Sequence, residues 1–95
     1  MYTLAVADST TLLGYKLWNG FEDSGTSYRL KDIDVQSFER EELSAYLRVL
    51  PSMAYAVREA TRINGIIAER CIKKVEVFAM PLSVLSRQME LLTRR

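Results

Sequence analysis

Histidine is absent from this sequence of 95 residues, and cysteine, proline and glycine are scarce. Histidine has the side-chain pKa nearest neutrality and is the commonest metal ligand in proteins. Its absence removes most familiar designs for acid and base catalysis and for metal binding. We therefore expect a protein that is not an enzyme, with no catalytic residue, no cofactor and no metal site.

The single cysteine and the lack of long hydrophobic runs narrow the class of protein further. Cys71 has no second cysteine with which to form an intramolecular disulfide, and its neighbour Ile72 favours a buried apolar position in a reducing compartment. No apolar run approaches the roughly 20 residues that span a bilayer. Residues 1–7 lack the pattern of a secretory signal. The expectation is a cytoplasmic protein with no membrane partner.

Neither the glycines nor the paired acidic residues form a recognisable catalytic motif. The four glycines are scattered, and none opens a helix within a phosphate-binding loop. Asp32 and Asp34 lie two residues apart in an extended run, a spacing that suits a divalent metal or a glycosidase. Because no third ligand follows at a recognisable spacing, we interpret this pair as the end of a strand and the approach to a helix.

The sequence contains enough apolar material for one folded domain, which we assign to residues 1–95. Apolar residues make up 48% of the chain and charged residues 26%. A domain of this size buries about 60 to 65% of the surface that its unfolded chain exposes. The length leaves no room for a second domain.

The two halves of the chain differ in charge. Residues 1–47 contain four basic and eight acidic side chains, whereas residues 48–95 contain nine basic and four acidic ones. A basic half of this kind either attracts a polyanion or pairs with the acidic half. Because the net charge is only +1, we favour pairing within the fold or between copies.

Alternation of apolar and polar residues predicts an antiparallel sheet built from hairpins. Four segments have the composition or the period of two that is typical of strands, residues 2–7, 13–18, 28–33 and 75–80. Asn19 and Gly20 are expected to end the second strand, and the loop 21–27 then joins it to the third. Pro81 is expected to end the fourth.

Two segments have the apolar period of a helix. Residues 37–49 begin with Ser37 as an N-cap, carry glutamates in the first turn and end before Pro51. Residues 83–93 are amphipathic and need a surface on which to pack, because a short helix alone is marginal in water. The predicted fold class is therefore α+β, a small antiparallel sheet of hairpins packed against two helices.

Residues 52–67 allow two interpretations. Ser52 can cap a helix in which Ala56, Ala60 and Ile63 lie on one face. Asn64 and Gly65, however, form a pair that is typical of a type I′ hairpin turn. We favour the hairpin. In the helical alternative Gly65 is the expected left-handed stop, so both interpretations place a boundary at this residue.

The runs GYKLWN, SYRLKDIDV, SFEREELSAYL and VREATRINGII resemble small accessory proteins carried by bacterial phages and mobile elements. The resemblance covers residues 13–67 and does not extend to the strand and helix predicted after Cys71. It implies a non-catalytic role, such as binding and blocking a host protein or regulating one.

Two groups of basic residues are candidates for a binding surface. The first forms on the first hairpin if Arg29 and Lys31 lie beside Lys16 and Trp18, which would give a basic sheet face with an aromatic platform for single-stranded nucleic acid. The second surrounds the predicted Asn-Gly turn and suits phosphate or an acidic protein surface. Its members are Arg58, Arg62, Arg70, Lys73 and Lys74.

The chain has more large apolar side chains than one small two-layer core hides, which predicts an interface. Arginine outnumbers lysine nine to four, and arginine and methionine are enriched in interfaces. We therefore predict a homo-oligomer, with a dimer as the first choice, formed through the C-terminal helix or an edge strand. The residues assigned to this interface are Phe78, Met80, Leu85, Met89 and Leu92.

The function predicted from these features is non-enzymatic protein binding, as a phage or mobile-element accessory or inhibitor protein that occupies the surface of a host protein. Nucleic-acid binding through the basic faces of the sheet is the alternative. The two differ in their salt dependence, because phosphate binding weakens steeply as ionic strength rises whereas an apolar interface barely responds.

Overall fold

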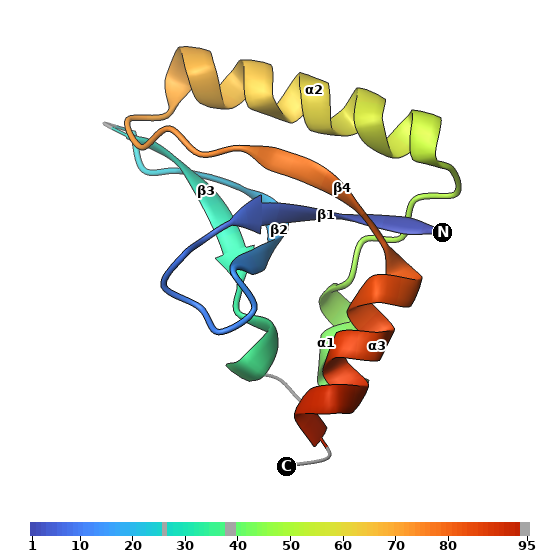
Figure 1. The fold of residues 1–95 in the computed structure, drawn as a ribbon. Helices are drawn as coiled ribbons and strands as arrows, with labels where there is room; N and C mark the ends of the chain where they lie inside the picture. Colours follow the sequence, from blue (N-terminus) through green and yellow to red (C-terminus); the bar gives the residue numbers. More distant parts are fainter. Residues whose placement is uncertain (26, 38–39, 94–95) are drawn as a thin grey trace.

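A computed structural model describes residues 1–25, 27–37 and 40–93. Within these residues an antiparallel sheet has the strand order β3-β2-β1-β4 (Figure 1). Its strands are β1 (Tyr2–Ala7), β2 (Tyr15–Asp23), β3 (Tyr28–Ile33) and β4 (Val77–Pro81). The helical elements are η1 (Val35–Ser37), α1 (Arg40–Tyr46), α2 (Met53–Arg70) and α3 (Leu82–Thr93). The predicted α+β fold class, an antiparallel sheet packed against helices, is confirmed.

Helices cover both faces of the sheet (Figure 1). On the face beneath α2, called the α2 face below, Leu4 and Val6 of β1 pack with Ile63 and Ile67. The side chains between them point the other way, because successive residues of a strand alternate between faces. The central strand β1 is therefore buried on both sides, and its sequence is an almost continuous apolar run.

The opposite face, called the α3 face below, packs against α1 and α3. Ala5 and Leu17 of the sheet lie here with Leu43 of α1 and with Leu85 and Met89 of α3. The predicted C-terminal helix is thus confirmed, and it begins directly after β4. Among the described helices, none combines the length and the apolar character needed to cross a membrane.

The second strand is longer than predicted, because Asn19 and Gly20 form a bulge instead of ending it. β2 continues to Asp23, and the register with β3 shifts between Trp18 and Phe21. Gly20 has a φ of 99°, which favours glycine. The extra residue brings Trp18 and Phe21 to the same face, with their ring centroids 5.9 Å apart in an edge-to-face arrangement.

The preferred hairpin at Asn64 and Gly65 is wrong, because both residues lie inside α2. Ser52 caps this helix by accepting a hydrogen bond from the backbone N–H of Tyr55 at 3.2 Å. The expected boundary at Gly65 is also wrong, since the helix continues to Arg70. A buried stripe with helical spacing decides the outcome, and it consists of Ala56, Ala60, Ile63 and Ile67.

The helix predicted at residues 37–49 ends earlier than expected, at Tyr46, and Ser37 belongs to η1. Ser37 ends η1, whose first turn is organised by Asp34: the carboxylate accepts from Gln36 N at 3.1 Å and the carbonyl from Ser37 N at 3.0 Å. Phe38 and Glu39, which follow in the predicted helix, lie outside the described residues. After α1 the chain becomes extended, and Leu50 exchanges two backbone hydrogen bonds with Tyr2.

Candidate functional site

The first predicted basic surface does not form, because its members lie on opposite faces of the sheet. Lys16 and Trp18 lie on the α2 face. Trp18 pairs with Asp32 of β3, so Lys31 and Arg29, at odd positions of the same strand, point to the α3 face. Trp18 is also only 7% exposed, so its ring offers no stacking platform to a nucleic-acid base.

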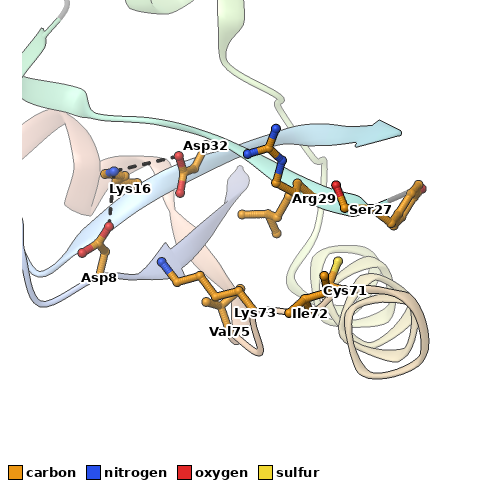
Figure 2. Close-up of a pocket in the computed structure, with 11 residues that line it drawn as sticks. Asp8, Lys16, Ser27, Arg29, Asp32, Cys71, Ile72, Lys73 and Val75 are labelled. Atoms are coloured by element: carbon orange, nitrogen blue, oxygen red, sulfur yellow. Dashed lines mark ion pairs between the residues drawn. The ribbon is translucent and has the colours of Figure 1, made fainter. Parts of the chain in front are cut away.

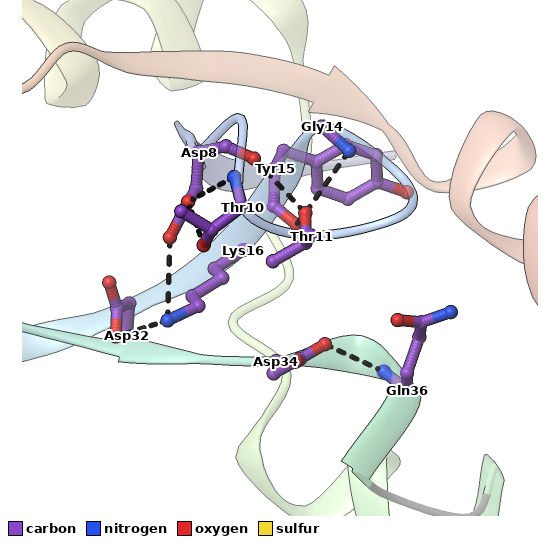
Figure 3. A network of polar contacts seen from close by, with 9 residues as sticks. All are labelled: Asp8, Thr10, Thr11, Gly14, Tyr15, Lys16, Asp32, Asp34 and Gln36. Atoms are coloured by element: carbon purple, nitrogen blue, oxygen red, sulfur yellow. Dashed lines mark hydrogen bonds and ion pairs between the residues drawn. The ribbon is translucent and has the colours of Figure 1, made fainter.

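The charge of Lys16 is balanced within the fold (Figure 3). Its Nζ lies 3.3 Å from Asp8 Oδ2 and 3.9 Å from Asp32 Oδ1. Hydrogen bonds donated by the hydroxyl and backbone N–H of Thr10, followed by the contact with Lys16, lower the pKa of Asp8 to about 2. The carboxylates of Asp32 and Asp8 in turn raise the pKa of Lys16. Lys16 is therefore a structural cation of the sheet.

The second predicted basic surface is divided among different roles, because the turn around which it was placed does not exist. Lys74 closes the C-terminus of α2 by donating from Nζ to the carbonyls of Ile67, Ala68 and Cys71. The last carbonyls of a helix have no partner within the helix, and a lysine near them also interacts favourably with the macrodipole. Lys74 is thus a helix cap.

Two arginines of this group have acidic or aromatic partners within the chain. Arg62 donates to Glu59 Oε2 from Nε at 3.1 Å and from Nη2 at 2.7 Å. Arg70 lies 3.9 Å above the ring centroid of Tyr28 and 3.8 Å from Asp23 Oδ2. The remaining two residues lie on different parts of the surface. Arg58 is exposed on α2, and Lys73 borders the groove described below.

Most residues assigned to an oligomer interface instead belong to the core of one chain. Met80, Leu85 and Met89 are buried in the cluster on the α3 face, and Phe78 packs against that cluster. The side chain of Leu92 lies outside the described residues. The sequence pattern correctly marked an apolar stripe, but the sheet of the same chain covers it.

A groove of about 530 Å³ lies on the α2 face beyond the end of α2, between β3 and the connection that leads to β4 (Figure 2). It exists because α2 ends at Arg70 and leaves this corner of the sheet uncovered. Its apolar lining comes from Tyr28, Leu30, Cys71, Ile72 and Val75. Its polar lining comes from Asp8, Lys16, Ser27, Arg29, Asp32 and Lys73.

The rim of the groove is more accessible than its floor. Ile72 is 81% exposed, an unusual position for a β-branched apolar side chain, whereas the Cys71 thiol beside it is buried. Figure 2 shows Lys73 extending along the groove toward Asp8, while Arg29 extends away from the connecting segment. The groove therefore combines an apolar centre with charges of both signs at its ends.

The two edges of the sheet are built differently. At the β4 edge, the side chain of Asn64 pairs with the backbone of Val77, with Nδ2 donating to the carbonyl at 2.9 Å and Oδ1 accepting from the N–H at 2.7 Å. Pro81 at the other end of the strand has no N–H to offer. A helix side chain and a proline thus close most of this edge to another strand.

The β3 edge has no comparable closure among the described residues. β3 is the outermost strand on this side, and the one further backbone contact found for it within residues 1–25, 27–37 and 40–93 is an isolated bridge between Tyr28 and Cys71. Arg29 and Lys31 are exposed on the α3 face, and Leu30 lies between them on the side of the groove. An open strand edge and an open groove therefore adjoin each other.

Sequence reasoning identified Lys16, Arg29 and Lys73 of the groove and Lys31 of the adjoining edge, but it did not identify the rest of this site. Alternation in residues 28–33 already separated Arg29 and Lys31 from Leu30, which is the signal for two different faces. No local signal marks Ile72 or Asp8, which reach the groove only through the tertiary fold. Within the described residues, no group of three or more acidic or cysteine side chains could hold a metal ion.

No protein-family model matches this chain, and no curated protein sequence or solved structure matches it significantly. The resemblance to phage and mobile-element accessory proteins therefore stays a prediction.

Proposed function

We propose that this protein is a non-enzymatic binding module that holds an extended segment of a partner protein along β3 and in the adjoining groove. The observation that carries the proposal is the contrast between the edges, since Asn64 and Pro81 close β4 whereas β3, beyond the bridge of Tyr28 to Cys71, is left open beside the groove. Proteins generally protect sheet edges, so an edge left open next to an apolar groove indicates a place for a partner strand.

The edge is suited to the backbone of such a segment, and the groove is suited to its side chains. An added strand gains affinity from main-chain hydrogen bonds with the edge, and specificity from side chains that enter pockets at alternate positions. A volume of about 530 Å³ is within the usual range of ligand sites, roughly 300 to 1,000 Å³, and holds one or two side chains of the segment. Leu30 and Ile72 supply the apolar contact.

Nucleic-acid binding is less well supported. The aromatic ring proposed for stacking belongs to Trp18 and is buried, and Lys16 is paired with two carboxylates. Lys74 is engaged with the end of α2, and Arg62 with Glu59. The cations needed to follow a phosphate backbone are therefore dispersed over both faces of the sheet.

The finer predictions of the sequence are part of this proposal. We propose that the partner is a host protein whose surface is occupied by an accessory or inhibitor protein, and that this takes place in the cytoplasm. Support for the first comes from the sequence resemblance, and for the second from the buried free thiol of Cys71. A homo-oligomer would need a surface other than the buried stripe of α3, and light scattering on a sizing column measures whether one forms.

A peptide selection tests the proposed function directly. The immobilised protein is used to enrich a displayed library of random peptides, and enriched peptides are titrated into isotope-labelled protein. We expect shifts at the backbone amides of β3 and of Ile72, and none along α3. The substitution Ile72→Glu should weaken binding at least about tenfold by placing a charge at the apolar rim.

Leu91→Glu is the matched control, because Leu91 is an exposed apolar residue of α3 on the other side of the sheet. It should leave peptide affinity unchanged. If no enriched peptide shifts the amides of β3, or if both substitutions weaken binding equally, this site is not the binding surface.

A further inference from the structure

The open edge of β3 carries its basic side chains on one face of the sheet. Arg29 and Lys31 are exposed on its α3 face, and no ion pair to either one is found among the described residues. The neighbour of Arg29 on β2 is Glu22, whereas Lys31 lies opposite the bulge at Asn19 and Gly20 and has no acidic neighbour there. The edge thus carries a cationic side chain at two alternate positions, and of these only Arg29 has an acidic neighbour in the register.

These charges disfavour a second copy of the chain as the occupant. Two β3 strands paired antiparallel about a two-fold axis place Lys31 opposite Lys31 of the other copy in the register centred on Lys31, and opposite Arg29 in the register centred on Leu30. Like charges directly opposite each other in a sheet are destabilising, and lysine on an edge is a usual protection against self-pairing. The edge is therefore open to a foreign strand and protected from its own.

The same arrangement specifies the complementary strand. Residues placed beside Arg29 and Lys31 on the α3 face are favoured if they are aspartate or glutamate. The residue between them points to the α2 face, where Leu30 and Ile72 favour an apolar side chain. The next position on that face lies beside Asp32, which disfavours another carboxylate.

We infer that the partner segment is acidic, with carboxylates at alternate positions that flank an apolar residue, and that it binds as an added strand beside Arg29 and Lys31. This inference rests on the proposed function and names the chemistry of its partner. Affinity then depends on the order of residues in the segment and on its total charge.

Four synthetic peptides of equal length test the inference by fluorescence anisotropy at moderate salt. The first alternates glutamate with valine, the second has serine for each glutamate, and the third has lysine. The fourth contains the residues of the first with its glutamates grouped at one end. We expect the alternating glutamate peptide to bind about tenfold more tightly than the serine peptide, and the lysine peptide to bind least.

Charge reversal in the protein completes the design. The double substitution Arg29→Glu and Lys31→Glu should invert the preference, so that the alternating lysine peptide binds better than the glutamate one. The control is Arg58→Glu with Arg87→Glu, which makes the same charge change at exposed positions of α2 and α3. It should leave the order of affinities unchanged.

The outcomes separate this inference from the proposed function. Equal affinity for the glutamate and serine peptides, with shifts confined to β3, overturns the acidic partner and leaves the binding site in place. Equal affinity for the alternating and grouped glutamate peptides shows general attraction to anions, which overturns the added strand. No shift at β3 with any peptide, including those enriched from the library, overturns both.

Discussion

In two places of this protein a single side chain makes hydrogen bonds to backbone groups that another backbone segment usually makes. Asn64 presents its amide to Val77 as a neighbouring strand would, with one donor and one acceptor in register. Lys74 likewise supplies the donors that the end of α2 lacks. Both residues belong to sequence features that suggested other roles, a turn and a phosphate site. Their actual partners lie outside those features in the sequence and come into contact only in the folded chain.

Replacing Asn64 by alanine should lower the free energy of unfolding by about 1 to 3 kcal/mol, because a part-buried N–H and C=O of Val77 lose their partners. Urea denaturation measures this loss. Thr61→Ala, one turn earlier on α2 and exposed, is the control and should change stability by less than about 0.5 kcal/mol. Equal losses in the two variants would show that the amide pairing contributes nothing specific.

The Asp8 carboxylate should make stability depend on acid. Because folding lowers its pKa from 3.8 to about 2, its ionised form stabilises the folded state above the ordinary pKa. That stabilisation is lost as the pH falls from about 4 toward 2. Urea midpoints measured across this range should therefore fall less steeply for Asp8→Asn than for the wild type. Ser9→Ala keeps the carboxylate and should keep the wild-type slope.

At the scale of elements, α2 shows how burial overrides a local turn signal. The Asn64 and Gly65 pair favours a hairpin by backbone preference alone, a matter of roughly 1 kcal/mol. The helix buries Ile63 and Ile67 against the sheet, each worth about 1.5 to 3 kcal/mol. Burial of the two isoleucines is the larger contribution and therefore favours the helix. In the helix Asn64 also gains hydrogen bonds to Val77 of β4.

Gly65→Ala distinguishes the two interpretations of this segment. Gly65 has helical backbone, and a Cβ atom added there meets no atom within 4 Å. Alanine should therefore raise the free energy of unfolding by about 0.5 to 1 kcal/mol. A hairpin turn with positive φ at this position would instead be destabilised by the same substitution. Thermal or urea denaturation gives the sign.

Other elements agree with their sequence patterns to different degrees. β1, β3 and α3 lie close to their predicted bounds, because alternation or helical period there coincides with the face that the fold buries. β2 is longer than predicted because Asn19 and Gly20 are accommodated as a bulge opposite Lys31. A pair of turn residues permits a bulge as readily as a strand end, and only the partner strand selects between them.

At the scale of the whole molecule, the sheet uses its faces and its edges for different purposes. Both faces are covered by helices of the same chain, which buries apolar stripes that otherwise indicate an interface. One edge is closed by Asn64 and Pro81, and the other adjoins the groove. Binding is therefore expected at an edge and a corner of the sheet.

Leu85→Ala tests whether the α3 stripe is core or interface. Leu85 is 2% exposed within one chain, so its truncation should lower the free energy of unfolding by about 2 to 5 kcal/mol at every protein concentration. A loss that shrinks at high concentration would instead indicate an interface between copies. Leu91→Ala, at a position 59% exposed, is the control and should cost less than about 0.5 kcal/mol.

The sequence by itself determined the fold class, most of the strands, the C-terminal helix and the exposed basic positions of β3. These properties follow from short-range periodicity, which any window of several residues contains. Only the tertiary structure decided that residues 53–70 form one helix, that Trp18 is buried and that Lys16 is paired with Asp8 and Asp32. Each of these depends on a partner from another element, because burial and pairing energies exceed local backbone preferences and are set by the complete fold.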